Sequence, residues 1–173
     1  MGHARKTLDL GLLTLRTAVG GTLAYHGAQK LFGWFGGPGL DATAQGFDAM
    51  GFKPGKQNAA LAGAGELAGA LLVVGAATPF ASAGVLGAMV GAVSVHKPNG
   101  FAATAGGYEY PAVLGATAVA LALTGPGRYS IDNLLGNRLN RGWQAGVALT
   151  SSAATSAFLV NRRAAAQNVS TEA

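Results

Sequence analysis

Ionisable side chains are scarce in this chain and are distributed unevenly along it. Residues 58–95 contain a single ionisable residue, Glu66, whereas basic residues collect near the N-terminus and beyond residue 128. Only 11% of the residues are charged, against about 25% in an average soluble domain. A domain of 173 residues with so little charge cannot cover its own surface with polar groups. This distribution predicts a protein that lies in a lipid membrane.

Four segments are apolar enough to form membrane-spanning helices, because a helix needs about 20 residues to cross a hydrocarbon core of about 30 Å. They are residues 8–30, 58–77, 80–96 and 109–125. The first span follows a basic N-terminus without a convincing cleavage site, so we expect a retained helix rather than a signal peptide. The short connection at 77–79 predicts an antiparallel hairpin. The fold class expected for residues 1–135 is therefore all-α, a transmembrane four-helix bundle.

Residues 136–173 form a C-terminal extension whose fifth segment, 143–160, is ambiguous. The segment is uncharged but rich in Ser, Thr and Ala, so its balance on insertion scales is marginal. It could span the membrane, lie at the surface or pack on the other helices. Trp143 and the pair at 162–163 slightly favour a span, because Trp and Arg anchor helix ends at the interface. A disordered tail is expected after it.

Residues 31–57 connect the first two spans and combine aromatic side chains with turn-forming Gly and Pro. Within this connection, residues 42–50 predict a short amphipathic helix. Aromatic rings are favoured in the lipid headgroup region. We therefore expect the connection to lie against the membrane as a cap; its aromatic residues are Trp34, Phe35, Phe47 and Phe52.

The net charge of +5 reflects few acids rather than many bases, since the chain has only twelve Lys plus Arg. No basic run with interleaved aromatics is present, so nucleic acid is not expected as a partner. The chain has no cysteine, which excludes disulfides, thiolate nucleophiles and Cys-ligated metal centres. Any redox role must run through a bound cofactor, a quinone-type substrate or a partner.

Basic residues near the helix ends favour, by five to four, an orientation with the N-terminus inside the cell. The inside set is Arg5, Lys6, Arg128, Arg138 and Arg141, and the outside set is Lys30, Lys53, Lys56 and Lys97.

Small residues let membrane helices approach closely. Six glycines at such positions predict a tight bundle: Gly20, Gly27, Gly65, Gly69, Gly87 and Gly91.

Ionisable residues inside a membrane normally face the bundle interior, because a charge at the bilayer centre costs about 2.5–3.5 kcal/mol on insertion scales. On the first helix, Arg16, His26 and Lys30 fall within an arc of about 80°. Counted from the helix ends, Arg16 and Glu66 differ in level by only about 6 Å. The spacing predicts a buried Arg16–Glu66 ion pair, which is more typical of an assembly contact than of a catalytic one.

The expected topology brings the ends of the first and third spans and the starts of the second and fourth to one membrane face. It predicts a polar pocket above Glu66, under the aromatic connection, formed by Arg16, His26, Lys30, Glu66, His96, Glu109 and Tyr110. Plainer interpretations are interfacial placement for Lys30 and Lys97 and an aromatic belt for Tyr110. Haem between His26 and His96 is a weak alternative. A metal site is not expected, because Glu66 and Glu109 are the only acids at membrane depth.

Four segments, in this order, resemble the DoxX family of small bacterial membrane proteins. They read RTAVGGTLAYHGAQKLFGWFGGPGL, GELAGALLVVG, GGYEYPAVL and TGPGRYSID. The resemblance covers about residues 10–135 and leaves 136–173 outside. The residues that the family marks most strongly correspond here to Arg16, His26, Gly27, Lys30, Glu66, Glu109 and Tyr110.

The resemblance implies a multi-pass protein of the bacterial inner (plasma) membrane linked to quinone-associated redox chemistry. The family's name-giving members are similar to the membrane subunit of a thiosulfate:quinone oxidoreductase, and others occur with oxidative-stress and quinone-detoxification partners. We therefore expect a component of a quinone-linked system that binds a small lipophilic headgroup, with quinone as the candidate cofactor. The alternative is a non-enzymatic membrane anchor or scaffold for soluble redox proteins. A pathway for protons or small solutes is a third, weaker hypothesis.

Overall fold

The computed structural model describes residues 2–171, and every regular element in that range is helical. The α-helices are α1 (Gly2–Phe32), α2 (Gly39–Ala49), α3 (Gly55–Leu67), α4 (Gly69–Val74), α5 (Thr78–His96), α6 (Glu109–Thr124), α7 (Ile131–Leu134) and α8 (Gly142–Thr171). Three 3-10 turns lie between them: η1 (Trp34–Gly36), η2 (Lys97–Asn99) and η3 (Ala103–Ala105). The predicted all-α bundle is confirmed.

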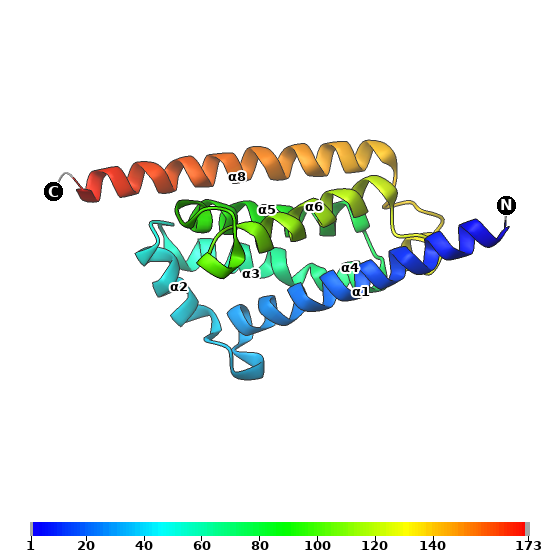
Figure 1. The fold of residues 1–173 in the computed structure, drawn as a ribbon, viewed down its shortest axis with the longest axis horizontal. Coiled ribbons are helices and arrows are strands. Elements are labelled where there is room, and N and C mark those ends of the chain that lie inside the picture. Colours follow the sequence, from blue (N-terminus) through cyan, green and yellow to red (C-terminus); the bar gives the residue numbers. More distant parts are fainter. Residues whose placement is uncertain (1, 172–173) are drawn as a thin grey trace.

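The bundle is elongated and layered (Figure 1). One layer contains α1 with α3 and α4, the middle layer contains α5 and α6, and α8 runs along the outside. Helix α5 is central, because it packs against α3, α6 and α8. Apolar side chains from these layers meet in one core, whose fully buried members include Leu23, Leu72, Val85, Ala118 and Leu121.

Two stretches are long and apolar enough to cross a membrane, Gly55–Val74 (α3 and α4 joined at Ala68) and Thr78–Asn99. Helix α6 is apolar but shorter. Helix α1 is long enough to cross a membrane, but charged residues such as Asp9 and Arg16 lower its mean hydropathy, and it is not among these stretches. The helices at 8–30 and 109–125 are therefore confirmed as helices, whereas their passage through a membrane stays a prediction.

The predicted close packing through glycine is confirmed where α1 crosses α4. A Cβ on Gly20 would lie 2.5 Å from the backbone oxygen of Gly69, and a Cβ on Gly69 would lie 2.5 Å from that of Gly20. A Cβ on Gly65 would instead meet the backbone oxygen of Gly84 on α5, at 2.6 Å. The two glycines of the Gly65/Gly69 motif therefore serve two different helix interfaces.

The fifth predicted segment is helical and packs along α5, and its helix extends from Gly142 to Thr171. Near its C-terminal end, Arg163 Nε donates to the carbonyl of Met50 at 2.8 Å and Nη1 donates to that of Ser94 at 2.9 Å. Arg163 also lies over the ring of Phe52. Packing on the other helices is thus observed, and passage of this segment through the membrane stays a prediction. The expected disordered tail is not found as far as Thr171, where the helix is continuous; residues 172–173 lie outside the described residues.

Candidate functional site

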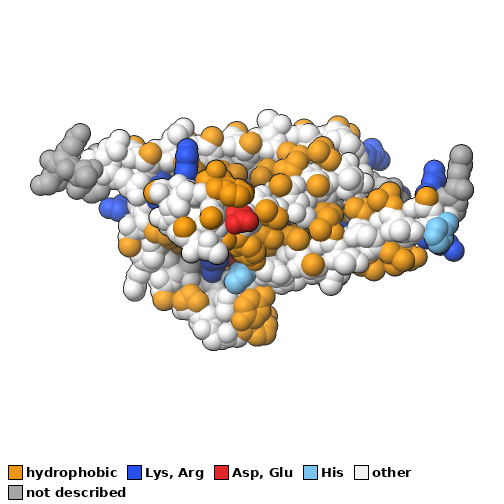
Figure 2. All heavy atoms as spheres, viewed as in Figure 1, with side chains coloured by type: hydrophobic (Ala, Val, Ile, Leu, Met, Phe, Trp, Pro, Cys, Tyr) orange, Lys and Arg blue, Asp and Glu red, His pale blue; other side chains and the backbone are white. Residues whose placement is uncertain are grey.

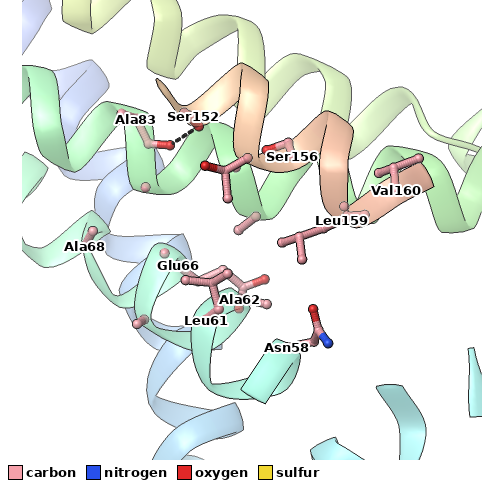
Figure 3. Close-up of a pocket in the computed structure, with 18 of the residues that line it drawn as sticks. Asn58, Leu61, Ala62, Glu66, Ala68, Ala83, Ser152, Ser156, Leu159 and Val160 are labelled. Atoms are coloured by element: carbon pink, nitrogen blue, oxygen red, sulfur yellow. Dashed lines mark hydrogen bonds between the residues drawn. The ribbon is translucent and has the colours of Figure 1, made fainter. Parts of the chain in front are cut away.

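A cavity of about 710 Å³ lies between α3, α5 and α8. Small residues of α5, such as Gly84, Gly87 and Ala88, form its floor. Helix α3 forms one wall, and helix α8 forms the wall opposite (Figure 3). The cavity exists because glycine and alanine on α5 leave space that larger side chains would fill.

An ion pair between Lys30 and Glu66 lies on the α3 side of this cavity. Lys30 Nζ donates to both carboxylate oxygens of Glu66, at 2.7 Å and 2.5 Å. The side chain of Glu66 is 10% exposed and that of Lys30 is 28% exposed, so both charges are partly withdrawn from solvent. A charge pair in such surroundings interacts more strongly than one on an open surface.

The predicted Arg16–Glu66 pair is wrong, because the register between α1 and the α3–α4 stretch differs from the one assumed. A Cβ on Gly27 would meet Gly63 and Leu67, so Glu66 lies level with the end of α1 that carries Lys30. Arg16 lies beside Gly75, nine residues beyond Glu66. Nine helical residues correspond to about 14 Å, which is more than an arginine side chain can bridge.

Arg16 belongs instead to a buried polar cluster at the other end of the bundle. Its side chain is fully buried, and Nη2 donates to the carbonyl of Tyr129 at 2.6 Å. Asp132 carries the nearby negative charge that favours the charged guanidinium, without a direct ion pair, and Nε and Nη1 of Arg16 are buried without a hydrogen-bond partner among the described residues. The Asp132 carboxylate accepts from the backbone N–H of Ala77 at 2.8 Å, and from the N–H and hydroxyl of Thr78 at 2.9 Å and 2.8 Å. Asp132 thus caps the start of α5 while compensating a buried positive charge.

The remaining four predicted site residues occupy different surroundings. His26 is half-buried, and its Nδ1 pairs with Gln29 Oε1 at 3.2 Å. His96 lines the cavity, although its Nδ1 is engaged by the carbonyl of Gly106 at 2.8 Å. Glu109 accepts from the backbone N–H of Ala103 at 2.9 Å and so holds the loop before α6. Tyr110 is half-exposed at the start of α6.

The structure therefore brings three of the seven predicted site residues to the cavity, namely Lys30, Glu66 and His96. Arg16, His26, Glu109 and Tyr110 are not among the residues that line it. His26 lies at the edge of the arc that contains Arg16 and Lys30, which explains its exposure. Among the described residues, no group of three or more His, Cys, Asp or Glu is placed to hold a metal ion.

Sequence reasoning missed the contribution of α8. Its cavity-facing residues recur in pairs every four positions: Val147, Ala148, Ser151, Ser152, Thr155, Ser156, Leu159 and Val160. Ser152 Oγ donates to the carbonyl of Ala83 at 2.7 Å, and Glu66 and Ser156 lie on opposite sides of the cavity (Figure 3). The four-residue spacing of small polar residues was the available signal, because it marks one helix face.

The aromatic connection divides into two parts. Phe47, Met50 and Phe52 line the cavity, as expected of a cap. Trp34 and Phe35 are 58% and 64% exposed and do not line it. On the face that Figure 2 shows, hydrophobic side chains gather between the ends of the bundle, as expected for a surface that contacts lipid.

The fold and the apolar helices define an all-α membrane bundle with a charged pair beside a cavity between α3, α5 and α8. The DoxX family model matches residues 11–98, which are 88 of the 173 residues. The chain therefore belongs to the DoxX family and is a membrane protein. Comparison with curated proteins and with solved structures finds no match. The matched region includes Arg16, His26, Lys30, Glu66 and His96, and it excludes Asp132 and all of α8.

Proposed function

We propose that the protein is an integral component of a quinone-linked redox or oxidative-stress system in the bacterial inner membrane. In this proposal it binds the headgroup of a quinone-type molecule in the cavity between α3, α5 and α8. The observation that carries the proposal is the Lys30–Glu66 ion pair at the wall of a cavity whose lining residues are mainly small or apolar. Membership of the DoxX family supports the proposed role in the membrane.

The residues present fit such a headgroup. A cavity of about 710 Å³ lies within the roughly 300–1,000 Å³ typical of small-molecule sites. An ammonium group has three N–H donors, and Lys30 directs two of its hydrogen bonds to Glu66. The third donor is available to a carbonyl oxygen of the ligand. Hydroxyl groups of Ser151 and Ser156 lie on the α8 wall, where they can donate to a second oxygen.

A bound quinone would supply two-electron, two-proton chemistry, which this chain's own side chains do not provide. Glu66 and His96 are the titratable groups that line the cavity beside Lys30, so they are the candidates for holding protons near the ligand. Apolar lining residues such as Leu61 and Leu159 would contact the ring. Because the chain has no cysteine, we assign electron delivery to a soluble partner protein.

The proposal is tested by replacing the ion pair with a neutral pair of similar shape, Lys30→Met with Glu66→Gln. Losing a charge-assisted hydrogen bond costs about 1.5–3 kcal/mol, so binding of a short-chain benzoquinone should weaken by roughly 10- to 100-fold. Calorimetry on the purified full-length protein in mild detergent measures the change. Unchanged benzoquinone affinity would show that the Lys30–Glu66 pair does not bind the headgroup.

The chain offers a matched control in a second Lys–acid pair, Lys56–Asp41, at 2.9 Å with side chains 69% and 83% exposed. Lys56→Met with Asp41→Asn should leave benzoquinone affinity unchanged.

If the Lys30/Glu66 variant does not fold, Gly91→Leu provides a second test. Gly91 lines the cavity and has no atom within 4 Å of its Cβ position, so leucine should fill the cavity and block binding without touching the ion pair.

The same variants distinguish the alternative function, a non-enzymatic anchor for soluble redox proteins. An anchor would keep its co-purifying proteins, identified by mass spectrometry, when the ion pair is neutralised. A ligand-dependent redox component would lose benzoquinone binding in the same preparation. Wild-type protein that binds no benzoquinone but retains such partners would favour the anchor.

A further inference from the structure

One end of the bundle carries a cluster of exposed basic residues. The N-terminal part of α1 and the segment between α6 and α8 lie together at this end (Figure 1). Its exposed basic residues are Arg5, Lys6, Arg128, Arg138 and Arg141. We call the segment 128–143, together with Arg5 and Lys6, the basic end.

The acidic residues of the basic end do not neutralise it at the surface. Asp9 is buried, and its carboxylate accepts from the backbone N–H of Arg128 at 3.0 Å. Asp132 is buried at the start of α5 and compensates Arg16. The surface charge of this end is therefore positive and uncompensated by exposed acids.

Large apolar side chains are exposed between these arginines. Leu134 is 81% exposed, Trp143 is 65% exposed and Leu135 is 56% exposed. The segment that presents them is held in place from inside, because Asn137 N–H donates to the carbonyl of Asp132 at 2.6 Å and Gln144 Oε1 accepts from the N–H of Arg141 at 2.7 Å. The apolar side chains are thus directed outward by an anchored backbone.

The opposite end also exposes aromatic rings, Trp34 and Phe35, and basic residues, Lys53, Lys97 and Arg162, but it differs in its acidic residues. Its Asp41 and Asp48 are exposed, and Lys56 is paired with Asp41. Arg163 is bound to the carbonyls of Met50 and Ser94 inside the bundle. Among the described residues, exposed aspartates therefore lie at this end and not at the basic end.

We propose that the basic end is a docking surface for an anionic phospholipid leaflet. The arginines contact lipid phosphates, while Leu134, Leu135 and Trp143 enter the boundary between headgroups and acyl chains. The inference does not depend on quinone binding.

The absence of cysteine allows a site-specific test. Leu134→Cys is labelled with a polarity-sensitive fluorophore, and the full-length protein is placed in nanodiscs of phosphatidylcholine alone or with phosphatidylglycerol. The anionic discs should shift the emission to shorter wavelength and lower quenching by acrylamide, a neutral quencher, by roughly twofold or more. The difference should shrink with Arg138→Gln and Arg141→Gln and in high salt.

Thr104→Cys, exposed in η3 at the opposite end, serves as the control and should respond equally in both compositions. Equal quenching of the Leu134 label in both compositions would overturn the proposal. So would protection that depends on protein concentration rather than on lipid charge, because that result identifies a second copy of the chain as the occupant. A lipid response unaffected by the arginine substitutions would also overturn it.

Discussion

Asp132→Asn is expected to lower the melting temperature of the detergent-solubilised protein by roughly 10 °C or more. The carboxylate accepts three hydrogen bonds at the start of α5 and compensates Arg16. An amide would place donors against the donors of Thr78 and would leave Arg16 buried without a counter-charge. Losing a hydrogen bond to a charged group typically costs about 1.5–3 kcal/mol, and the carboxylate accepts three. Thermal unfolding followed by circular dichroism measures the effect.

Asp41→Asn is the matched control, because the Asp41 side chain is 83% exposed and pairs with Lys56 at the surface. Exposed ion pairs contribute about 0–1 kcal/mol, so the melting temperature should stay nearly unchanged. A similar melting temperature for both variants would show that the cluster around Asp132 does not stabilise the fold.

Gly20→Ala and Gly21→Ala are expected to change stability in opposite directions, although the two residues are neighbours in α1. A methyl group at position 20 would lie 2.5 Å from the backbone oxygen of Gly69, and overpacking of this kind costs about 1–3 kcal/mol. Position 21 is exposed, with no atom within 4 Å of its Cβ position. There, alanine should stabilise the helix by about 0.5–1 kcal/mol.

Melting temperatures of the two alanine variants, measured in the same detergent, test this difference. Because α1 carries Lys30, the Gly20→Ala variant should also bind benzoquinone more weakly than Gly21→Ala. Equal stability of the two variants would contradict the close crossing of α1 and α4.

The helices themselves could be predicted from the sequence, because their signals are local. Pro79 suits the first turn of a helix, and α5 begins at Thr78 with Pro79 in that turn. The segment 109–125 corresponds closely to α6. The amphipathic segment at 42–50 lies within or next to α2. Each of these predictions depends on residues close together in the chain.

The pairing of charges could not be predicted in the same way, because it depends on how two helices slide along each other. The register between α1 and the α3–α4 stretch is set where Gly20 meets Gly69 and where Gly27 meets Gly63. Those contacts place Lys30, and not Arg16, beside Glu66. The role of Asp132 was hidden for a related reason, since it reaches Arg16 and Thr78 from a distant part of the chain.

Helix α8 is the other feature that sequence reasoning left open. Its Ser and Thr residues weaken its membrane signal, yet Ser152 and Ser156 are small enough to pack against Gly87 of α5. The same residues form a wall of the cavity. A composition that is marginal for a lone membrane span is therefore suited to packing on another helix.

Photolabelling tests the central claim, quinone binding between α3, α5 and α8, most directly. A photoreactive benzoquinone analogue is cross-linked to the full-length protein in nanodiscs, and the labelled peptides are identified by mass spectrometry. We predict labels near Leu61–Glu66 on α3 and near Ser152–Leu159 on α8, reduced by excess unlabelled benzoquinone and by Lys30→Met with Glu66→Gln. Labels confined to outward-facing residues such as Val113 of α6, or unaffected by competitor, would contradict the claim.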